Sequence, residues 1–157
     1  MPANTNARAA NALVLAGAGA LVGGALLSQY VGGLFPCEMC HWQRWPHYAA
    51  LVLGLLAWAL GSNRALVALA ALAVLVSGAI GVFHAGVEYR WWEGVTTCTA
   101  APITGSKSEI LGSLMATPLV RCDVAQWTLF GVSLAGYNAL LSSLIGGGAL
   151  WLLRKPR

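Results

Sequence analysis

Four long apolar stretches constrain this chain more than any other feature of its sequence. Hydrophobic residues make up 58% of its 157 residues and charged residues only 9%, whereas a soluble domain carries roughly a quarter charged residues. A helix of about 20 apolar residues spans the hydrocarbon core of a membrane, and open strand edges cannot be satisfied in lipid. We therefore expect an all-α membrane protein, a four-transmembrane-helix bundle with spans at residues 12–30, 45–60, 65–85 and 129–153.

The charged residues predict how this bundle lies in the membrane. Five of the nine basic residues fall at the chain ends and in the turn between the second and third spans, namely Arg8, Arg64, Arg154, Lys155 and Arg157. By the positive-inside rule that side is the cytoplasm, so both termini are expected there. All five acidic residues and all four cysteines lie on the other side.

The chain is expected to form a single membrane domain over residues 1–157, with a short outer loop at about 31–44 and a long one at about 86–128. The net charge of +4 reflects this topology, and nothing in the sequence indicates nucleic-acid binding.

Four cysteines on one side of a membrane protein point to redox chemistry. The spacing suggests that Cys37 pairs with Cys40 and Cys98 with Cys122, although four cysteines permit three connectivities. Two pairs, one near the membrane and one on a long outer loop, would suit an electron relay by thiol–disulfide exchange. Taken alone, the loop pair could instead be a structural staple.

Cys40 is the candidate for the more acidic thiol of the first pair. A helix N-terminus and a nearby cation both favour the thiolate, and Arg44 follows Cys40 by four residues, on the same face of a helix that begins near it. Cys37 is then expected to be the more exposed partner, in the loop before that helix. Pro46 suits the first turn of the second span.

Three other interpretations remain open on these residues alone. Cys37-x-x-Cys40-His41 matches the pattern for covalent attachment of c-type haem, so a membrane-anchored haem electron carrier is the alternative function. The cysteines with His41, His47 or His84 could bind zinc, although Cys98 and Cys122 do not form a second knuckle and we expect no metal. All four could also be purely structural.

The whole chain resembles the bacterial disulfide bond formation protein B (DsbB) family. The motifs that carry the resemblance are Pro36-Cys37-x-x-Cys40-x-x-Gln43-Arg44, then His84-Ala85-Gly86-Val87-Glu88 with Trp91-Trp92-Glu93-Gly94 and Cys98, and finally Cys122-Asp123-x-x-x-Trp127 leading to Phe130-Gly131-x-Ser133-x-x-x-x-Asn138. His41 and Trp42 depart from the apolar residues that usually follow the C-x-x-C.

The resemblance implies an enzyme of the bacterial inner membrane, a multi-pass protein with its active cysteines on the periplasmic side. It implies that the protein reoxidises a thioredoxin-fold periplasmic partner of the DsbA type and passes the electrons to ubiquinone or menaquinone in the membrane lipid. Cys98 would form the mixed disulfide with the partner, Cys122 would resolve it, and Cys37 and Cys40 would be reduced next.

Two further residues are candidates for binding the quinone. The resemblance implies that Cys40 faces the quinone and that Arg44 stabilises negative charge on the thiolate and the reduced ring. His84, at the outer end of the third span, is a candidate to hydrogen-bond a quinone carbonyl, or else an interfacial histidine satisfied by backbone or water. Ser133 and Asn138 are expected to form hydrogen bonds between helices.

Overall fold

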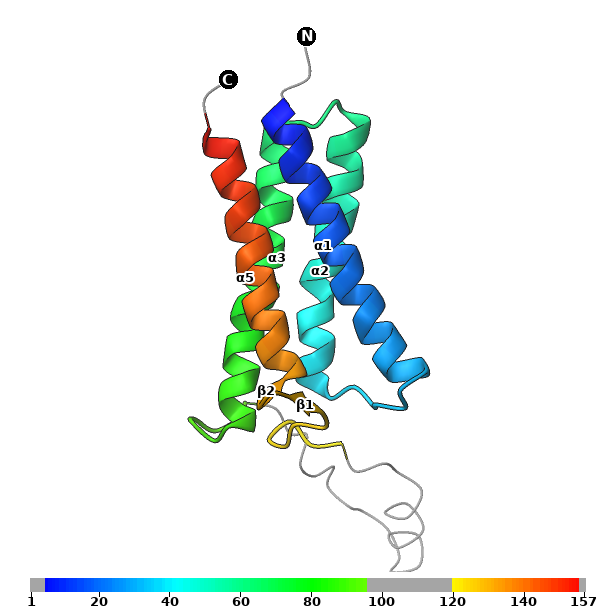
Figure 1. The fold of residues 1–157 in the computed structure, drawn as a ribbon, viewed down its shortest axis with the longest axis vertical. Helices are drawn as coiled ribbons and strands as arrows, with labels where there is room; N and C mark the ends of the chain where they lie inside the picture. The colour runs from blue at the N-terminus through cyan, green and yellow to red at the C-terminus, as the bar shows by residue number, and fades with distance from the viewer. Residues whose placement is uncertain (1–4, 96–119, 156–157) are drawn as a thin grey trace, which may run out of the picture.

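The computed structural model describes residues 5–95 and 120–155, and these form a bundle of long helices with one small hairpin at its lower end (Figure 1). The elements in chain order are α1 (Thr5–Tyr30), α2 (Glu38–Ala59), α3 (Arg64–Glu88), β1 (Thr128–Leu129), β2 (Val132–Ser133) and α5 (Leu134–Arg154). The two strands pair antiparallel, with Thr128 opposite Ser133. The predicted helical bundle is thus confirmed, while the hairpin was not predicted.

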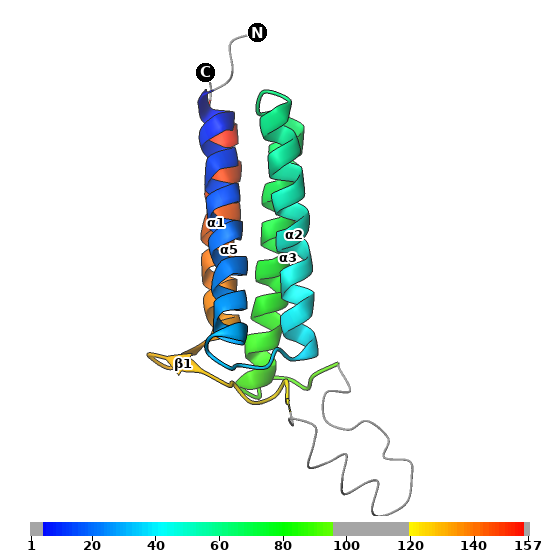
Figure 2. The same ribbon diagram turned by 90° about the vertical axis from the view of Figure 1, so that its right-hand side faces the viewer.

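Each helix packs mainly against two neighbours, and α1 also contacts α3. α2 and α3 form one antiparallel pair and α1 and α5 the other (Figure 2), and the pairs join because α3 packs on α5 and α1 packs on α2. The start of α1 lies beside the end of α5, since Asn6 Nδ2 donates to the backbone carbonyl of Lys155 at 3.4 Å. The start of α3 lies there too, because the Arg64 guanidinium donates to the carbonyl of Leu153. The cysteine motif and the hairpin lie at the opposite end (Figure 1).

Small side chains fill the interior and large ones face outward. One core cluster is built mostly of alanine and valine, including Ala10, Ala57 and Val74, all of which are fully buried. Large residues such as Leu144, by contrast, are exposed. Helices in lipid pack through small residues because burying large apolar ones gains nothing there. This arrangement fits a bundle surrounded by membrane.

Three of the helices in the described residues, α1, α3 and α5, are long and apolar enough to cross a membrane. α2 is not among them, because its first half carries polar residues such as Gln43 and Arg44. The predicted second span therefore stays a prediction.

Three helix starts differ from the predicted spans, and the first is that of α1, which begins at Thr5 rather than 12. α2 begins at Glu38 rather than 45, so Pro46 lies inside the helix and not in its first turn, which corrects that prediction. α5 begins at Leu134 rather than 129, because Phe130 and Gly131 adopt left-handed backbone angles (φ 50° and 77°) that turn the hairpin.

A neighbouring helix donates a hydrogen bond beside the interior proline, although the carbonyl that Pro46 leaves without its helical donor is that of Trp42, four residues before it. A proline inside a helix lacks its N–H and crowds the preceding turn. The Oγ of Ser77 on α3 donates to the backbone carbonyl of Gln43, three residues before Pro46, at 2.7 Å. Serine side chains from adjacent helices are a known means of satisfying backbone groups near a proline in lipid.

Candidate functional site

The two cysteines of the C-x-x-C motif lie in the first turn of α2. Cys37 is the N-cap residue, and its Sγ accepts a hydrogen bond from the backbone N–H of Cys40 at 3.2 Å. An N-cap side chain normally caps this third N–H of its helix, so the spacing of the motif brings the second cysteine next to the first. The two Sγ atoms of these free cysteines are 2.8 Å apart, so a small movement would form a disulfide of about 2.05 Å.

Cys37 is the more buried of the two cysteines, and the prediction that it would be the more exposed is wrong. Its exposed fraction is 4%, whereas Cys40 is only partly buried. The reason is the cap itself, which turns the Cys37 side chain inward to pack in one cluster with Met39, Val87 and Cys122. This group is called the cysteine cluster below.

The hydrogen bond between the two sulfurs separates their acidities. The Cys37 thiol donates to the sulfur of Cys40, which raises the pKa of Cys37, and burial raises it further. The same hydrogen bond lowers the pKa of Cys40. Cys40 lies before the predicted second span, which begins at residue 45. The thiolate is therefore favoured at Cys40. The charge of Arg44 also lowers this pKa, but it contributes less than the sulfur contact.

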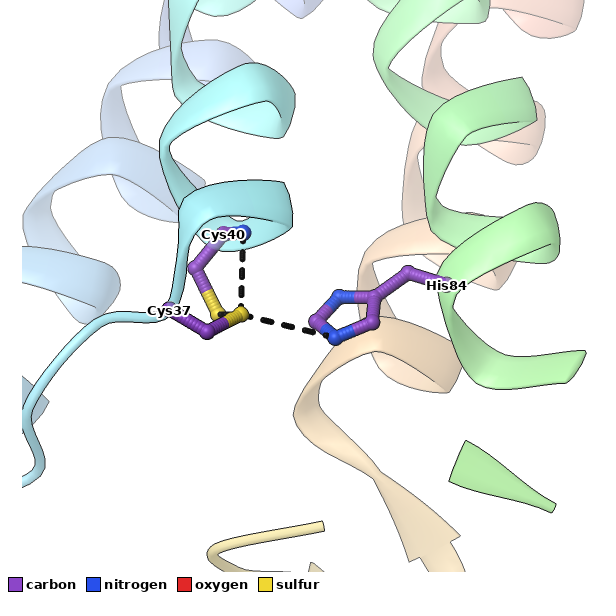
Figure 3. A group of neighbouring side chains, drawn as sticks. All are labelled: Cys37, Cys40 and His84. Carbon is purple, nitrogen blue, oxygen red and sulfur yellow. Dashed lines mark hydrogen bonds between the residues drawn. The ribbon is translucent and has the colours of Figure 1, made fainter. Parts of the chain in front are cut away.

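His84 of α3 faces the cysteine pair from across the bundle (Figure 3). Its exposed fraction is 2%, its Nε2 lies 3.5 Å from the Sγ of Cys37, and the same nitrogen lies 3.8 Å from a carboxylate oxygen of Glu88. The Nδ1 atom on the other side of the ring lies 2.7 Å from Nε2 of Gln43. The sulfurs and a ring nitrogen lie within 4.8 Å of one another, a grouping that could hold a metal ion by distance alone.

One cysteine of the second pair reaches the same place. Cys122 is 4% exposed and belongs to the cysteine cluster with Cys37. It is disulfide-bonded, and its backbone lies within hydrogen-bonding reach of His84. Cys98 lies outside the described residues. The structure thus brings three of the four predicted cysteines together.

An exposed ion pair borders Cys122. The guanidinium of Arg121 donates to both carboxylate oxygens of Asp123, at 2.9 and 2.6 Å. This hydrogen bonding lowers the pKa of Asp123. Because both side chains meet solvent, the pair shapes the outer surface beside the cysteine cluster and adds little to its stability.

A row of buried polar side chains runs inward from the cysteine cluster, and two of its members, Gln43 and His47, were not predicted to belong to it. Asn138 of α5 donates to Gln43 of α2 at 2.8 Å and to the backbone carbonyl of Ser77 on α3 at 3.1 Å, which confirms its predicted role between helices. Gln43 and His47 could have been singled out from the sequence, because polar residues in or near membrane spans are costly and mark function.

Ser133 links α5 to the end of α3, as predicted, but through its backbone. Its N–H donates to the Tyr89 hydroxyl at 2.9 Å, and its Oγ accepts the backbone N–H of Gly136 at 3.1 Å as the N-cap of α5. This cap fixes where α5 begins, beside the outer end of α3.

Two pockets meet at Cys40. The larger, about 260 Å³, lies between α1, α2 and α5 and is lined mostly by apolar side chains, with Cys40, Arg44 and Asn138 among its polar ones. The smaller, about 60 Å³, opens on the other side and is lined by both cysteines and His84. Cys40 and Arg44 line both, whereas His84 lines only the smaller one of the two.

Arg44 is held by α1. Its guanidinium donates to the side-chain oxygen of Gln29 at 2.6 Å and to the backbone carbonyl of Ala25 at 3.3 Å. These bonds fix a positive charge at the outer end of the larger pocket, on the face of α2 that also carries Cys40.

The geometry disfavours covalent haem at the C-x-x-C-H motif. The sulfur of Cys37 is packed within the cysteine cluster, and the side chain of His41 is exposed on the outer face of α2. Both thioether bonds and the axial ligand would have to meet on one open face, and here they do not.

Comparison with known proteins identifies the chain at the level of its family. The model of the family described as disulfide bond formation protein DsbB matches residues 7–152. No curated protein and no solved structure matches the chain.

Proposed function

The chain belongs to the DsbB family of disulfide bond formation proteins and is a disulfide-generating membrane oxidoreductase, and from this premise we propose its partners and its electron path. The protein reoxidises a periplasmic thioredoxin-fold dithiol oxidase of the DsbA type. Its electrons leave through ubiquinone or menaquinone in the membrane. Cys98 with Cys122 forms the outer redox pair, and Cys37 with Cys40 forms the inner one.

The observation that carries the proposal is the place of Cys122. This disulfide-bonded residue shares one buried cluster with Cys37, so a dithiol formed at the outer pair would adjoin the inner pair. A purely structural staple would have no need to lie against free cysteines. We assign Cys98, the remaining cysteine of the four, as the partner of Cys122.

Electrons pass by two thiol–disulfide exchanges. A thiolate of the partner attacks Cys98, Cys122 leaves, and the second thiol of the partner releases Cys98, so the partner gains a disulfide and the outer pair becomes a dithiol. The outer dithiol then reduces the Cys37–Cys40 disulfide in the same way. Each exchange breaks one S–S bond and forms one through a mixed disulfide, so electrons and protons balance.

The larger pocket fits the headgroup of a quinone. Its walls are mostly apolar, as in most small-molecule sites, and a few polar groups stand at one end, with Cys40 and Arg44 among them. A bound quinone accepts two electrons and two protons. Cys40 would supply sulfur as the favoured thiolate, and Arg44 would stabilise negative charge that develops beside it.

His84 was a candidate for the quinone, and its place suggests a different role. It lines the smaller pocket beside Cys37, so we propose that it acts on sulfur. The proposed topology has four spans in the bacterial inner membrane, with both termini cytoplasmic and the cysteine cluster on the periplasmic side. The shared end of α1 and α5 supports it.

Catalytic turnover in reconstituted membranes tests the proposal. We expect purified protein with quinone to oxidise a reduced thioredoxin-fold dithiol substrate over many cycles, and Cys40→Ser and Cys98→Ser each to abolish turnover. Ser143→Ala is the matched control, because the Ser143 hydroxyl bonds only the Ala139 carbonyl of its own helix at 2.7 Å. Full activity of either cysteine variant would contradict the relay.

A further inference from the structure

A chain of buried side-chain hydrogen bonds runs from the middle of the bundle to Cys37. It passes from His47 to Asn138, from Asn138 to Gln43, and from Gln43 to His84, with separations of 3.0, 2.8 and 2.7 Å. The side chain of His84 ends the chain 3.5 Å from the sulfur. Polar groups at this depth in a membrane protein are costly unless they are paired. Two backbone carbonyls determine which group donates and which accepts in each of these hydrogen bonds.

The first fixed point is the carbonyl of Ser77. The side-chain nitrogen of Asn138 lies 3.1 Å from it, and a backbone carbonyl can only accept. The amide of Asn138 must therefore point its NH₂ group toward Ser77 and Gln43. Its oxygen faces the other way and accepts from His47 Nε2 and from Ser142 Oγ, both at 3.0 Å.

The second fixed point is the carbonyl of Met39. The side-chain nitrogen of Gln43 lies 3.2 Å from this carbonyl, and the oxygen of Gln43 accepts from Asn138. Both contacts require the same orientation of the Gln43 amide. Its NH₂ group must then donate to Nδ1 of His84 as well.

The tautomer of His84 follows. A neutral imidazole has one N–H and one lone pair, and Nδ1 must hold the lone pair because it accepts from Gln43. The proton is therefore on Nε2, which faces the sulfur of Cys37 and the carboxylate of Glu88. Figure 3 shows this nitrogen directed at the cysteine pair.

We propose that Gln43, itself oriented by Asn138, is a positioning residue that fixes His84 as a hydrogen-bond donor to the sulfur of Cys37. During exchange each sulfur passes through the thiolate form, and the Cys37 thiolate is the one that burial and Cys40 disfavour. The donor on His84 stabilises that thiolate without taking a proton. The stabilisation of the Cys37 thiolate during exchange rests on the proposed function, whereas the assignment of the His84 tautomer does not.

The same arrangement also disfavours metal binding at the cysteine pair, because it leaves Nε2 of His84 without a lone pair. Zinc binds thiolates and the lone pair of a neutral imidazole, and the atoms of Cys37, Cys40 and His84 are close enough for such a site. With the proton on Nε2, that nitrogen has no lone pair for a metal at the cysteine pair, and Nδ1 is engaged by Gln43. The hydrogen-bond chain therefore weakens the binding of zinc to the reduced cysteine pair.

Nitrogen NMR of the full-length protein, ¹⁵N-labelled at histidine and reduced in detergent micelles without quinone, tests the tautomer. We expect His84 to show a protonated Nε2 and an unprotonated Nδ1, with the signals assigned by a His84→Gln variant. In Gln43→Glu, at a pH where the introduced carboxyl is ionised, the carboxylate can only accept, so the proton should move to Nδ1. Ser143→Ala should change nothing. A protonated Nδ1 in the unmodified protein would overturn the inference, as would an unchanged tautomer in folded Gln43→Glu with that carboxyl ionised.

Zinc binding gives a second, independent readout. Because Gln43→Glu frees Nε2, its reduced form should bind Zn²⁺ at least tenfold more tightly than the unmodified protein, and adding His84→Gln should remove the gain. Equal affinities would contradict the inference. If Gln43→Glu does not fold, Gln43→Met removes the donor to Nδ1 and should give a mixture of His84 tautomers, while a single Nε2–H form would contradict it. If the tautomers are as expected but the protein shows no quinone-dependent turnover, the proposed function is refuted and the assignment of the tautomer stands.

Discussion

The two ends of the bundle are built on different principles. In the half toward the chain termini, called the dry half below, the interior is mainly alanine and valine, such as Ala10 and Val67, and the buried Asn11 donates to the Gly54 carbonyl at 3.0 Å. At the other end, sulfur and imidazole groups occupy the interior beside Cys122. Close packing of small residues holds helices together in lipid, whereas buried polar groups serve chemistry. One half therefore serves as the scaffold, and the other holds the groups of the proposed reaction.

The largest expected effect comes from removing the outer pair. Cys122→Ser should reduce quinone-dependent turnover by at least about 100-fold, because the proposed exchange with the inner pair depends on its sulfur. Ala57→Ser in the dry half should leave turnover nearly unchanged, since its hydroxyl can bond to its own helix. Turnover of the reconstituted variants is the measurement.

This pair of variants also separates relay from staple. If Cys122 were only a staple, Cys122→Ser would unfold more readily but keep its turnover when folded. Resistance to unfolding in mixed detergent, measured beside turnover, would reveal that outcome.

The next effect belongs to the dry half and concerns stability. A Cβ added at Gly146 would lie 2.6 Å from a side-chain carbon of Leu75 and 2.9 Å from the carbonyl of Ala71. Overpacking of this kind costs about 1–3 kcal/mol, so Gly146→Val should lower the free energy of unfolding by that amount. Gly147→Val is the control, because a Cβ at Gly147 meets nothing within 4 Å. Equal losses in the two variants would show that the close contact of α3 with α5 is unimportant.

A third prediction concerns the acidity of Cys40. Its pKa is lowered mainly by the hydrogen bond from Cys37, so Cys37→Ala should raise this pKa and move the pH profile of Cys40 alkylation to higher pH. Because a raised pKa leaves less thiolate, alkylation at neutral pH should slow. Cys37→Ser keeps a hydroxyl that can donate and should shift the profile less. Identical profiles for Ala and Ser would assign the low pKa to another cause.

The sequence predicted the bundle well where the pattern was apolar and poorly where polar groups set the boundary. The third span, predicted at 65–85, is close to Arg64–Glu88. The start of α2 was displaced because its first turns are amphiphilic and extend beyond the apolar run, with Cys37 as the cap. The start of α5 was displaced because Ser133 caps it after a tight turn.

The site was predictable in its residue types but not in its contacts. The C-x-x-C spacing predicted that Cys37 and Cys40 lie together, yet the burial of the capping Cys37 also requires Val87 of α3, a helix distant in the sequence. The approach of Cys122 and the amide chain through Gln43 likewise arise from tertiary contacts between separate helices. No local pattern in the sequence encodes such contacts.

The smallest effect tests hydrogen bonding where the two halves of the bundle meet. The Ser77 hydroxyl on α3 donates to the backbone carbonyl of Gln43 on α2, in the turn before Pro46. Interhelical hydrogen bonds in membranes average about 0.6 kcal/mol, so Ser77→Ala should lower the free energy of unfolding by roughly that amount. Ser143→Ala loses only a bond within its own helix and should have almost no effect. A loss for Ser77→Ala no larger than for Ser143→Ala would mean that the polar half is held by the same apolar packing as the dry half.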